Sequence, residues 1–294
     1  MNLHDQIRSN KRKSMFLVFV FLILIGFLAA VLGLILGNII FGLVIGLIGA
    51  VIYTLIVFSS GSNMILSMTG AKPVTKAEYP HLYHTVEGLT IAAGLKNIPK
   101  CYVIKDSALN AFATGKNQDN SVIVVTTGLM NKLNRQELEG VVAHEMSHIM
   151  NEDIKVMMLA AVLVGVTVLI SDVLLRSFIF GKKNEGNSNL PLIILGIVLA
   201  IVAPIIAYLI KLGISRKREF MADANGAILT RYPPGLASAL KKIAKDPDPL
   251  VDKANKATAH LFISTPFRNT KGWLTGLFST HPPIMERVHR LEQM

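Results

Sequence analysis

Charged residues are scarce and unevenly spread in this chain. Only 17% of its 294 residues are Asp, Glu, Lys or Arg, and none of these lies between Ser14 and Ala71. A typical soluble domain carries about 25% charged residues, so this composition argues against one. The uncharged stretch divides at Gly37-Asn38 into Met15 to Leu36 and Ile39 to Phe58. Because about 20 apolar residues in a helix span a bilayer core, the sequence predicts two transmembrane helices here.

Cysteine is nearly absent as well, since Cys101 is the only one. A single cysteine excludes an intrachain disulfide and suits a reducing compartment. We expect it to be a small buried side chain in a strand. The chain also lacks tandem repeats and any evident nucleic-acid-binding module. Its net charge of +11 is therefore better explained by attraction to anionic lipid than to nucleic acid.

A second pair of apolar segments follows later in the chain. Val156 to Leu175 is interrupted only by Asp172 near its end, and Leu190 to Ile210 contains Pro204. Asp172 and Pro204 weaken the prediction of membrane spans here but do not exclude it. The alternative is a buried helical hairpin in a soluble core. We predict four transmembrane helices in total.

The distribution of Lys and Arg predicts the orientation in the membrane. These residues are dense before the first span and after the fourth, at Arg8, Lys11, Arg12, Lys13, Lys211, Arg216, Lys217 and Arg218. By the positive-inside rule both termini lie in the cytoplasm, although Arg176, Lys182 and Lys183 in the last loop argue against this. The expected division is a hairpin over 1–58, a cytoplasmic half over 59–155, a second hairpin over 156–210 and a second cytoplasmic half over 211–294.

A cleaved signal peptide is the alternative for the first span, because basic residues precede an apolar run there. That run is too long, no convincing small-residue cleavage site ends it, and another apolar segment follows almost at once. These features favour a retained helix.

The segment after the first hairpin has mixed α and β patterns. We expect a helix from about Glu78 to Ala93, and then strands over Cys101 to Lys105, Ala111 to Thr114 and Val122 to Thr126, with a turn over Gly115 to Asn120. Asn134, with Glu137 three residues later, predicts a capped helix start. That helix would carry the motif His144-Glu145-Met146-Ser147-His148.

Two histidines four residues apart on a helix lie on one face, one turn apart, which suits a zinc ion. Glu145 between them could take a proton from water at such a site. A helix with two surface histidines is the alternative. Zinc needs a third protein ligand, but Glu152 lies about 12 Å further along the helix axis and position 154 is Ile instead of the third histidine of an extended motif.

Glu219 is the strongest candidate for this third ligand, because Asp223 shares its helical face and could orient a ligand histidine. Two crossings separate His148 from Glu219, so both return to the same side of the membrane. The alternative is an exposed Glu219 paired with its Lys and Arg neighbours.

At this point the chain resembles the HtpX-type membrane zinc metallopeptidases, relatives of the CAAX prenyl endopeptidases. The resemblance covers the paired N-terminal spans, Asn110-Ala111-Phe112-Ala113, the His144 to His148 motif, Glu219 to Asp223, and Ser279-Thr280-His281-Pro282-Pro283 followed by Arg287. It implies one zinc ion held by His144, His148 and Glu219, with Glu145 as general base and Asp223 orienting a ligand.

The same resemblance assigns two further roles. His281 and Arg287 would stabilise the tetrahedral intermediate, and both could face one site as donors. The alternative is a capping histidine and an arginine paired with Glu286 or Glu292. Asn110, Ala111, Phe112 and Ala113 would form an edge strand whose exposed backbone binds an extended substrate, and ordinary sheet structure is the alternative.

We therefore expect a mostly α membrane protein with four transmembrane helices and a cytoplasmic α+β zincin-type protease domain carrying a small β-sheet. The implied function is zinc-dependent cleavage of damaged or misfolded membrane proteins at cytoplasmic segments, as stress-responsive quality control in the cell membrane. The alternatives are a CAAX-type prenyl-protein endopeptidase, whose relatives have more spans, and a non-catalytic zinc-binding membrane scaffold.

Overall fold

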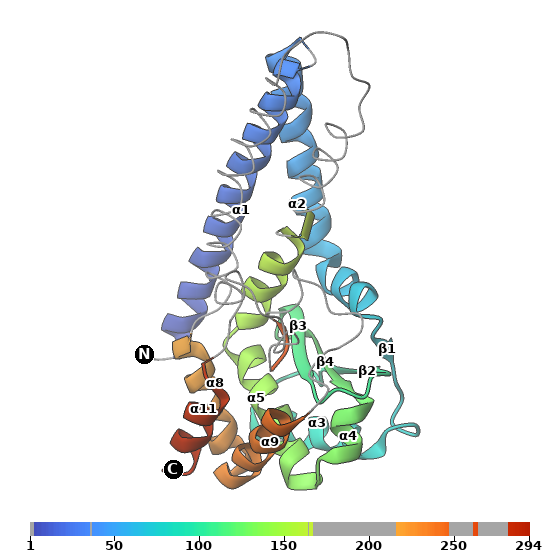
Figure 1. Ribbon diagram of the computed structural model, residues 1–294, viewed down its shortest axis with the longest axis vertical. Helices are drawn as coiled ribbons and strands as arrows, with labels where there is room; N and C mark the ends of the chain where they lie inside the picture. Colours follow the sequence, from blue (N-terminus) through green and yellow to red (C-terminus); the bar gives the residue numbers. More distant parts are fainter. Residues whose placement is uncertain (1–2, 36, 164, 167–215, 247–260, 264–281) are drawn as a thin grey trace.

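The computed structural model describes residues 3–35, 37–163, 165–166, 216–246, 261–263 and 282–294. Within these residues the fold is mostly helical and consists of a long helical hairpin joined to a mixed α/β body (Figure 1). The first half of the predicted third span is described as helix over 156–163 and 165–166, whereas the rest of that span and the whole of the predicted fourth span lie outside the described residues.

The hairpin consists of α1 (Leu3–Ile35) and α2 (Ile39–Thr69). Gly37, with a φ of 85°, makes the turn, and the Asn38 side chain caps α2 by accepting from the Phe41 N–H at 3.0 Å. Both helices are long and apolar enough to cross a membrane, over Ile7–Val31 and Ile39–Thr69. They run past the predicted span limits toward the body, so the hairpin is continuous with the α/β part (Figure 1).

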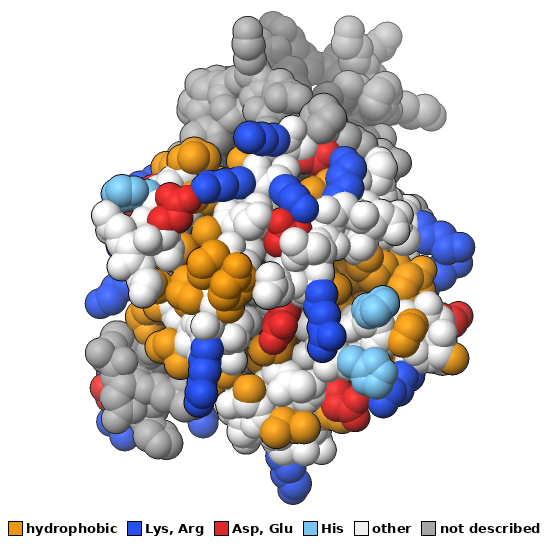
Figure 2. Space-filling view, turned by 90° about the horizontal axis from the view of Figure 1, so that it is seen from below, with side chains coloured by type: hydrophobic (Ala, Val, Ile, Leu, Met, Phe, Trp, Pro, Cys, Tyr) orange, Lys and Arg blue, Asp and Glu red, His pale blue; other side chains and the backbone are white. Residues whose placement is uncertain are grey.

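The surface of α2 carries many exposed apolar side chains, among them Ile40 at 72%, Phe41 at 63% and Leu55 at 64% exposure. A contiguous apolar surface of this kind suits lipid contact. The opposite end of the molecule differs, because there Lys and Arg mix with Asp and Glu among scattered apolar side chains (Figure 2). The exposed surface thus divides into an apolar hairpin and a polar body.

The body contains a four-stranded mixed sheet with strand order β1-β2-β4-β3. The strands are β1 (Lys72–Pro73), β2 (Lys100–Ile104), β3 (Ala111–Asn117) and β4 (Asn120–Thr126). β2 runs parallel to β4, whereas β1 and β3 are antiparallel to their neighbours. The three predicted strands are confirmed, but the turn predicted over Gly115 to Asn120 is wrong. β3 and β4 pair through Asn117 and Asn120, so only residues 118–119 form the turn.

Successive side chains of a strand point to opposite faces of the sheet, and here both faces are buried. Phe112, Val122 and Val124 face a core shared with the hairpin and with the helix over 153–163. Ile123 and Val125 face a second core. The sheet therefore lies between the membrane hairpin and the body helices.

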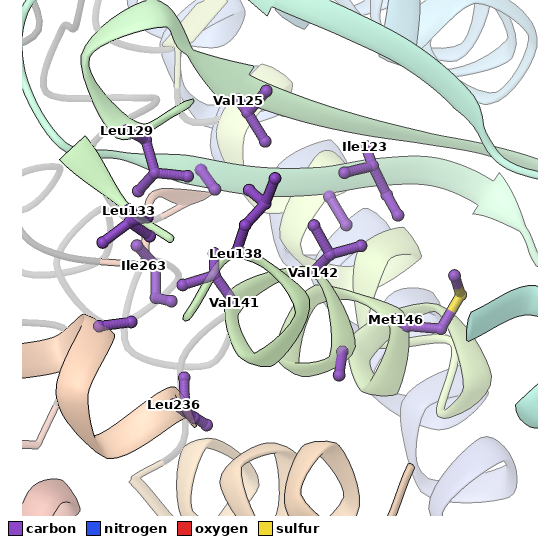
Figure 3. Packing of buried hydrophobic residues seen from close by; sticks show 14 of the residues in the cluster. Ile123, Val125, Leu129, Leu133, Leu138, Val141, Val142, Met146, Leu236 and Ile263 are labelled. Carbon is purple, nitrogen blue, oxygen red and sulfur yellow. The ribbon is translucent and has the colours of Figure 1, made fainter. Parts of the chain in front are cut away.

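That second core packs the sheet against α5 (Arg135–Met150), whose Val141, Val142 and Met146 point toward it (Figure 3). The surrounding helices are α3 (Pro80–Ala92), α4 (Thr127–Lys132), α8 (Arg216–Thr230), α9 (Pro233–Lys245) and α11 (Ile284–Leu291). Cys101 is buried in β2, as predicted, and burial raises the pKa of its thiol to about 12.

The predicted capping box at the start of α5 is confirmed. The Asn134 side chain accepts from the Glu137 N–H at 2.9 Å, and the Glu137 carboxylate accepts from the Asn134 N–H at 2.8 Å. From α9, Ser238 and Lys242 also donate to the Glu137 carboxylate, each at 2.7 Å. Burial raises the pKa of Glu137, but these bonds outweigh it and the pKa is lowered. Helix α5 is thus fixed in its first turn at Glu137, eleven residues before His148.

Candidate metal centre

Helix α5 brings His144 and His148 together on one face. The two imidazole rings lie 4.9 Å apart, centre to centre, at right angles to each other, and both are almost fully buried. The alternative considered from the sequence, a helix with two surface histidines, is therefore wrong.

Glu219 reaches the same place from the first turn of α8. One of its carboxylate oxygens lies 3.7 Å from Nε2 of His144 and the other 3.6 Å from Nε2 of His148. Glu219 is only 4% exposed, so the alternative of an exposed glutamate among lysines and arginines is wrong. One ligand atom from each of the three residues lies within 4.8 Å of the others.

This separation fits a metal ion. Tetrahedral zinc with bonds of 2.0–2.1 Å holds its ligand atoms roughly 3.3 Å apart, and the His to Glu distances are only a few tenths of an ångström longer. Two imidazoles and one carboxylate are also a ligand set that zinc takes in proteases. The three residues could therefore hold one metal ion.

Close contact between α8 and α5 makes this convergence possible. A Cβ added at Gly226 would lie 3.1 Å from the backbone nitrogen of His144. The absence of a side chain there lets the two helices touch directly at the motif. Asn225 adds a bond of 3.1 Å from its Nδ2 to Oγ of Ser147 inside the motif. Glu219, Asp223 and Gly226 recur at helical spacing, so one face of α8 meets α5.

Asp223 and Arg287 orient His144. One oxygen of Asp223 lies 3.0 Å from Nδ1 of His144, which leaves Nε2 toward Glu219. The guanidinium of Arg287 binds both oxygens of Asp223, from Nε at 2.8 Å and from NH2 at 2.7 Å. Burial is the largest effect on His144 and lowers its pKa to about 4. A neutral ring is the form that binds a metal.

The sequence-based alternative for Arg287, an exposed ion pair with Glu286 or Glu292, is wrong. Arg287 is fully buried, and those two glutamates pair with Arg290 and Lys241 instead. The guanidinium lies beside His144, with NH2 at 3.3 Å from Nδ1 and 3.4 Å from Nε2 of the ring. His281, the other residue expected to stabilise an intermediate, lies outside the described residues.

Asp153 orients the second histidine, and sequence reasoning missed it. Its Oδ2 lies 3.0 Å from Nδ1 of His148. Helix α5 ends at Met150, and Glu152 has a left-handed φ of 54°, so the chain turns sharply and brings Asp153 back to the ring. Burial lowers the pKa of His148, but Asp153 and Glu219 outweigh it and raise the pKa to about 9. A carboxylate just past the helix end was the available signal.

Glu145 lies beside this cluster and contacts the sheet. It is 2% exposed, and the Ala113 backbone N–H donates to its carboxylate. Burial is the main reason that its pKa rises to about 7, with the Glu219 carboxylate adding to the effect. A carboxylate with such a pKa both accepts and releases a proton near neutral pH.

Ala111 to Ala113 are the first residues of β3 and Asn110 directly precedes it; within the described residues β3 is an edge strand of the sheet, as expected. Their backbone is not exposed, however, because all four residues are at most 2% exposed. The Ala111 carbonyl accepts from the Ile263 N–H at 2.9 Å, and the Ile263 carbonyl accepts from Arg287 at 3.2 Å. The edge beside the histidines is thus covered by the chain itself.

Comparison with known protein sequences identifies a peptidase family. The model of peptidase family M48 matches residues 76–294. A protein named protease HtpX homolog from Dictyoglomus turgidum is 46% identical over 298 residues, covering 99% of this chain and 94% of the relative. One of the same name from Streptococcus gordonii is 38% identical over 300 residues, covering 99% and 100%. The crystal structure of Ste24p from S. mikatae is similar with a TM-score of 0.49 and 18% identity, over 98% of this chain and 66% of that one.

Proposed function

Because this chain belongs to peptidase family M48 and is a membrane metalloprotease, we propose that it is a zinc-dependent endopeptidase with one zinc ion held by His144, His148 and Glu219. The observation that carries the proposal is the convergence of these three buried side chains, from two helices far apart in sequence, at distances that fit zinc. Asp223 and Asp153 orient the two histidines so that Nε2 of each is the metal ligand.

A bound zinc ion supplies Lewis acidity, which activates a water molecule and polarises the peptide carbonyl. The carboxylate of Glu145 would accept a proton from the attacking water and pass it to the leaving amine. Its burial and the bond from Ala113 keep the carboxylate beside the first half of β3, where a scissile bond aligned along the strand would lie. Arg287 holds Asp223 and adds positive charge next to His144, and with His281 it would stabilise negative charge that develops on the substrate.

We propose that Asn110, Ala111, Phe112 and Ala113 bind substrate as an added strand. Backbone groups of Ala111 and Ala113 point away from β4, since the Asn110 carbonyl accepts from Thr126 in that sheet pair. A substrate that pairs with Ala111 has to take over the carbonyl that accepts from Ile263 here. Substrate binding therefore requires that the hydrogen bond from the Ile263 N–H to the Ala111 carbonyl breaks.

The site is proposed to lie at the cytoplasmic surface of the cell membrane. The apolar hairpin is continuous with the sheet that borders the site, and the expected second hairpin over 156–210 would return the chain from the half over 59–155 to that over 211–294. Substrates would be damaged or misfolded membrane proteins with accessible cytoplasmic segments. Attraction of the basic ends to anionic lipid would hold the body at the bilayer.

The substitution Glu145→Gln tests the proposal. It removes the proton acceptor but keeps the shape and the metal ligands, so cleavage of a membrane-protein substrate by purified enzyme with zinc should fall by about 100-fold or more. Zinc content and thermal stability should not change. Glu139→Gln, the same change on a partly exposed residue of α5, is the matched control and should stay active. Undiminished cleavage by Glu145→Gln would exclude this mechanism and favour a non-catalytic scaffold.

A further inference from the structure

A buried polar cluster joins the membrane hairpin to the candidate metal centre. Asp153 uses its Oδ2 for His148, and its Oδ1 accepts from Nδ2 of Asn10 at 2.8 Å and from NH1 of Arg218 at 3.2 Å. Asn10 and Asp153 are 3% and 1% exposed. Because water has little access here, these protein bonds decide where the carboxylate lies.

The amide of Asn10 matches its surroundings closely. Nδ2 has two hydrogens, and it donates to Oδ1 of Asp153 and, at 2.9 Å, to the backbone carbonyl of Asn151. Oδ1 of Asn10 faces the Arg218 guanidinium, with NH1 at 3.4 Å. An amide supplies both donors and the acceptor, whereas a carboxylate would place negative oxygens against Asp153 and a carbonyl.

These contacts bring together three segments that are distant in sequence. Asn10 lies near the start of α1, the first helix of the membrane hairpin, whereas Asp153 follows the motif helix α5 and Arg218 belongs to α8, the helix of Glu219. Figure 1 shows the start of α1 directly above α8. The membrane helix thus contacts the carboxylate that fixes one histidine and the helix that carries the third ligand.

We propose that Asn10 is a positioning residue for the metal centre, which acts through Asp153 on the ring of His148. This inference depends on the proposed zinc site. According to this proposal, α1 helps to position the metal ligands in addition to anchoring the protein in the membrane. Loss of the Asn10 amide leaves Arg218 as the hydrogen-bond donor to Oδ1 of Asp153 among the described residues, so the carboxylate and the imidazole are less firmly oriented.

The alternative is that Asn10 only docks α1 on the body, and a matched control separates the two. Ser14 lies one turn later on the same face of α1 and is equally buried, but its hydroxyl has no hydrogen-bond partner within the described part of the chain. Ser14→Ala therefore changes a buried polar residue at the same helix contact without touching Asp153.

The experiment uses the full-length protein in detergent micelles. Zinc affinity is measured by competition with a chelator, the ligand field by the visible spectrum of the cobalt-substituted protein, and folding by thermal unfolding of the metal-free protein. Asn10→Ala should weaken zinc binding about 10-fold, at the lower end for partners of metal ligands, and alter the cobalt spectrum. Ser14→Ala should match the wild type in both.

Two further variants complete the test. Asn10→Ser keeps one donor and should bind zinc with intermediate affinity; it decides the question if Asn10→Ala does not fold. Combined with Asp153→Asn, Asn10→Ala should add little further loss, because the two residues act on the same histidine.

Wild-type zinc affinity and an unchanged cobalt spectrum in a folded Asn10 variant would overturn the inference, as would equal losses in Asn10→Ala and Ser14→Ala. If His148→Ala loses zinc binding in the same assay, the proposed site survives that result. If the wild type itself binds no zinc, or His148→Ala binds as well as the wild type, the proposed function fails and the inference with it.

Discussion

The buried pair of Arg287 and Asp223 gives the most quantitative prediction. Arg287 is fully buried and binds Asp223 through two bonds of 2.7 and 2.8 Å, while Asp223 is 2% exposed. Arg287→Met keeps an unbranched apolar chain but removes the cation that neutralises the carboxylate, and the neutral ring of His144 at 3.0 Å cannot replace that charge. Breaking one side of a buried ion pair costs about 3–5 kcal/mol, which is a large part of a total stability of about 5–15 kcal/mol.

The cost should depend on the charge left behind. In Arg287→Met/Asp223→Asn the buried charge of Asp223 is removed as well, so part of the loss should be recovered. Arg287→Lys keeps the charge but makes one contact in place of two, and should fall between wild type and Arg287→Met.

The difference in the free energy of unfolding between wild type and Arg287→Met should become smaller at acid pH. Burial raises the pKa of Asp223, but Arg287 and His144 outweigh it and lower the pKa to about 2, below its usual value of 3.8. The pair therefore stabilises the fold above pH 4, and this contribution is lost as pH falls toward 2.

Chemical denaturation of the metal-free variants in mild detergent measures these differences. A stability of Arg287→Met within 1 kcal/mol of the wild type would refute the reasoning, because it would mean that the carboxylate is not effectively buried. Failure of the double variant to improve on Arg287→Met would show that the loss comes from packing and not from charge.

Three other outcomes follow from the described contacts. Glu137→Gln should lower thermal stability at pH 7, and the difference from wild type should vanish as pH falls below about 4.5, because the lowered pKa of Glu137 stabilises the fold only while the group is ionised; a difference independent of pH would contradict this. Gly226→Ala places a methyl group 3.1 Å from His144 N and should weaken zinc affinity by displacing Glu219 with α8, whereas Gly88→Ala, with no atom within 4 Å of the new methyl group, should not. Removal of zinc by a chelator should lower the melting temperature, since a ligand at 1,000 times its Kd stabilises by about 4 kcal/mol; an unchanged melting temperature would argue against a metal in the folded protein.

Local features of this protein were predictable because they depend on neighbours in sequence. The uncharged stretch before Ala71 determined the hairpin, since no helix exposes that much apolar surface to water. The Asn134 and Glu137 spacing determined the start of α5, and helical geometry alone put His144 and His148 on one face. Short runs of residues that favour strands located the strands, although the extent of β3 and β4 depended on their pairing with each other.

Contacts between distant segments needed the tertiary structure. The sequence proposed Glu219 as a ligand from its charge and its place after the membrane segments, but only the packing of α8 on α5 at Gly226 brings it within 3.7 Å of the histidines. Asp153 stood five residues past the motif and was overlooked, because the left-handed turn at Glu152 that directs it back has no sequence signal in a non-glycine residue. Asn10 was not predicted at all, because it lies among basic residues and its contact with Asp153 is 143 residues away in sequence.

The sequence by itself thus determined the membrane hairpin, the strands and the metal-binding motif, because hydrophobicity and periodicity act over a few turns. The tertiary structure decided which charges meet inside the protein. A carboxylate, an amide or a guanidinium that is buried away from water needs a hydrogen-bond partner, and its partner is a side chain that folding brings next to it.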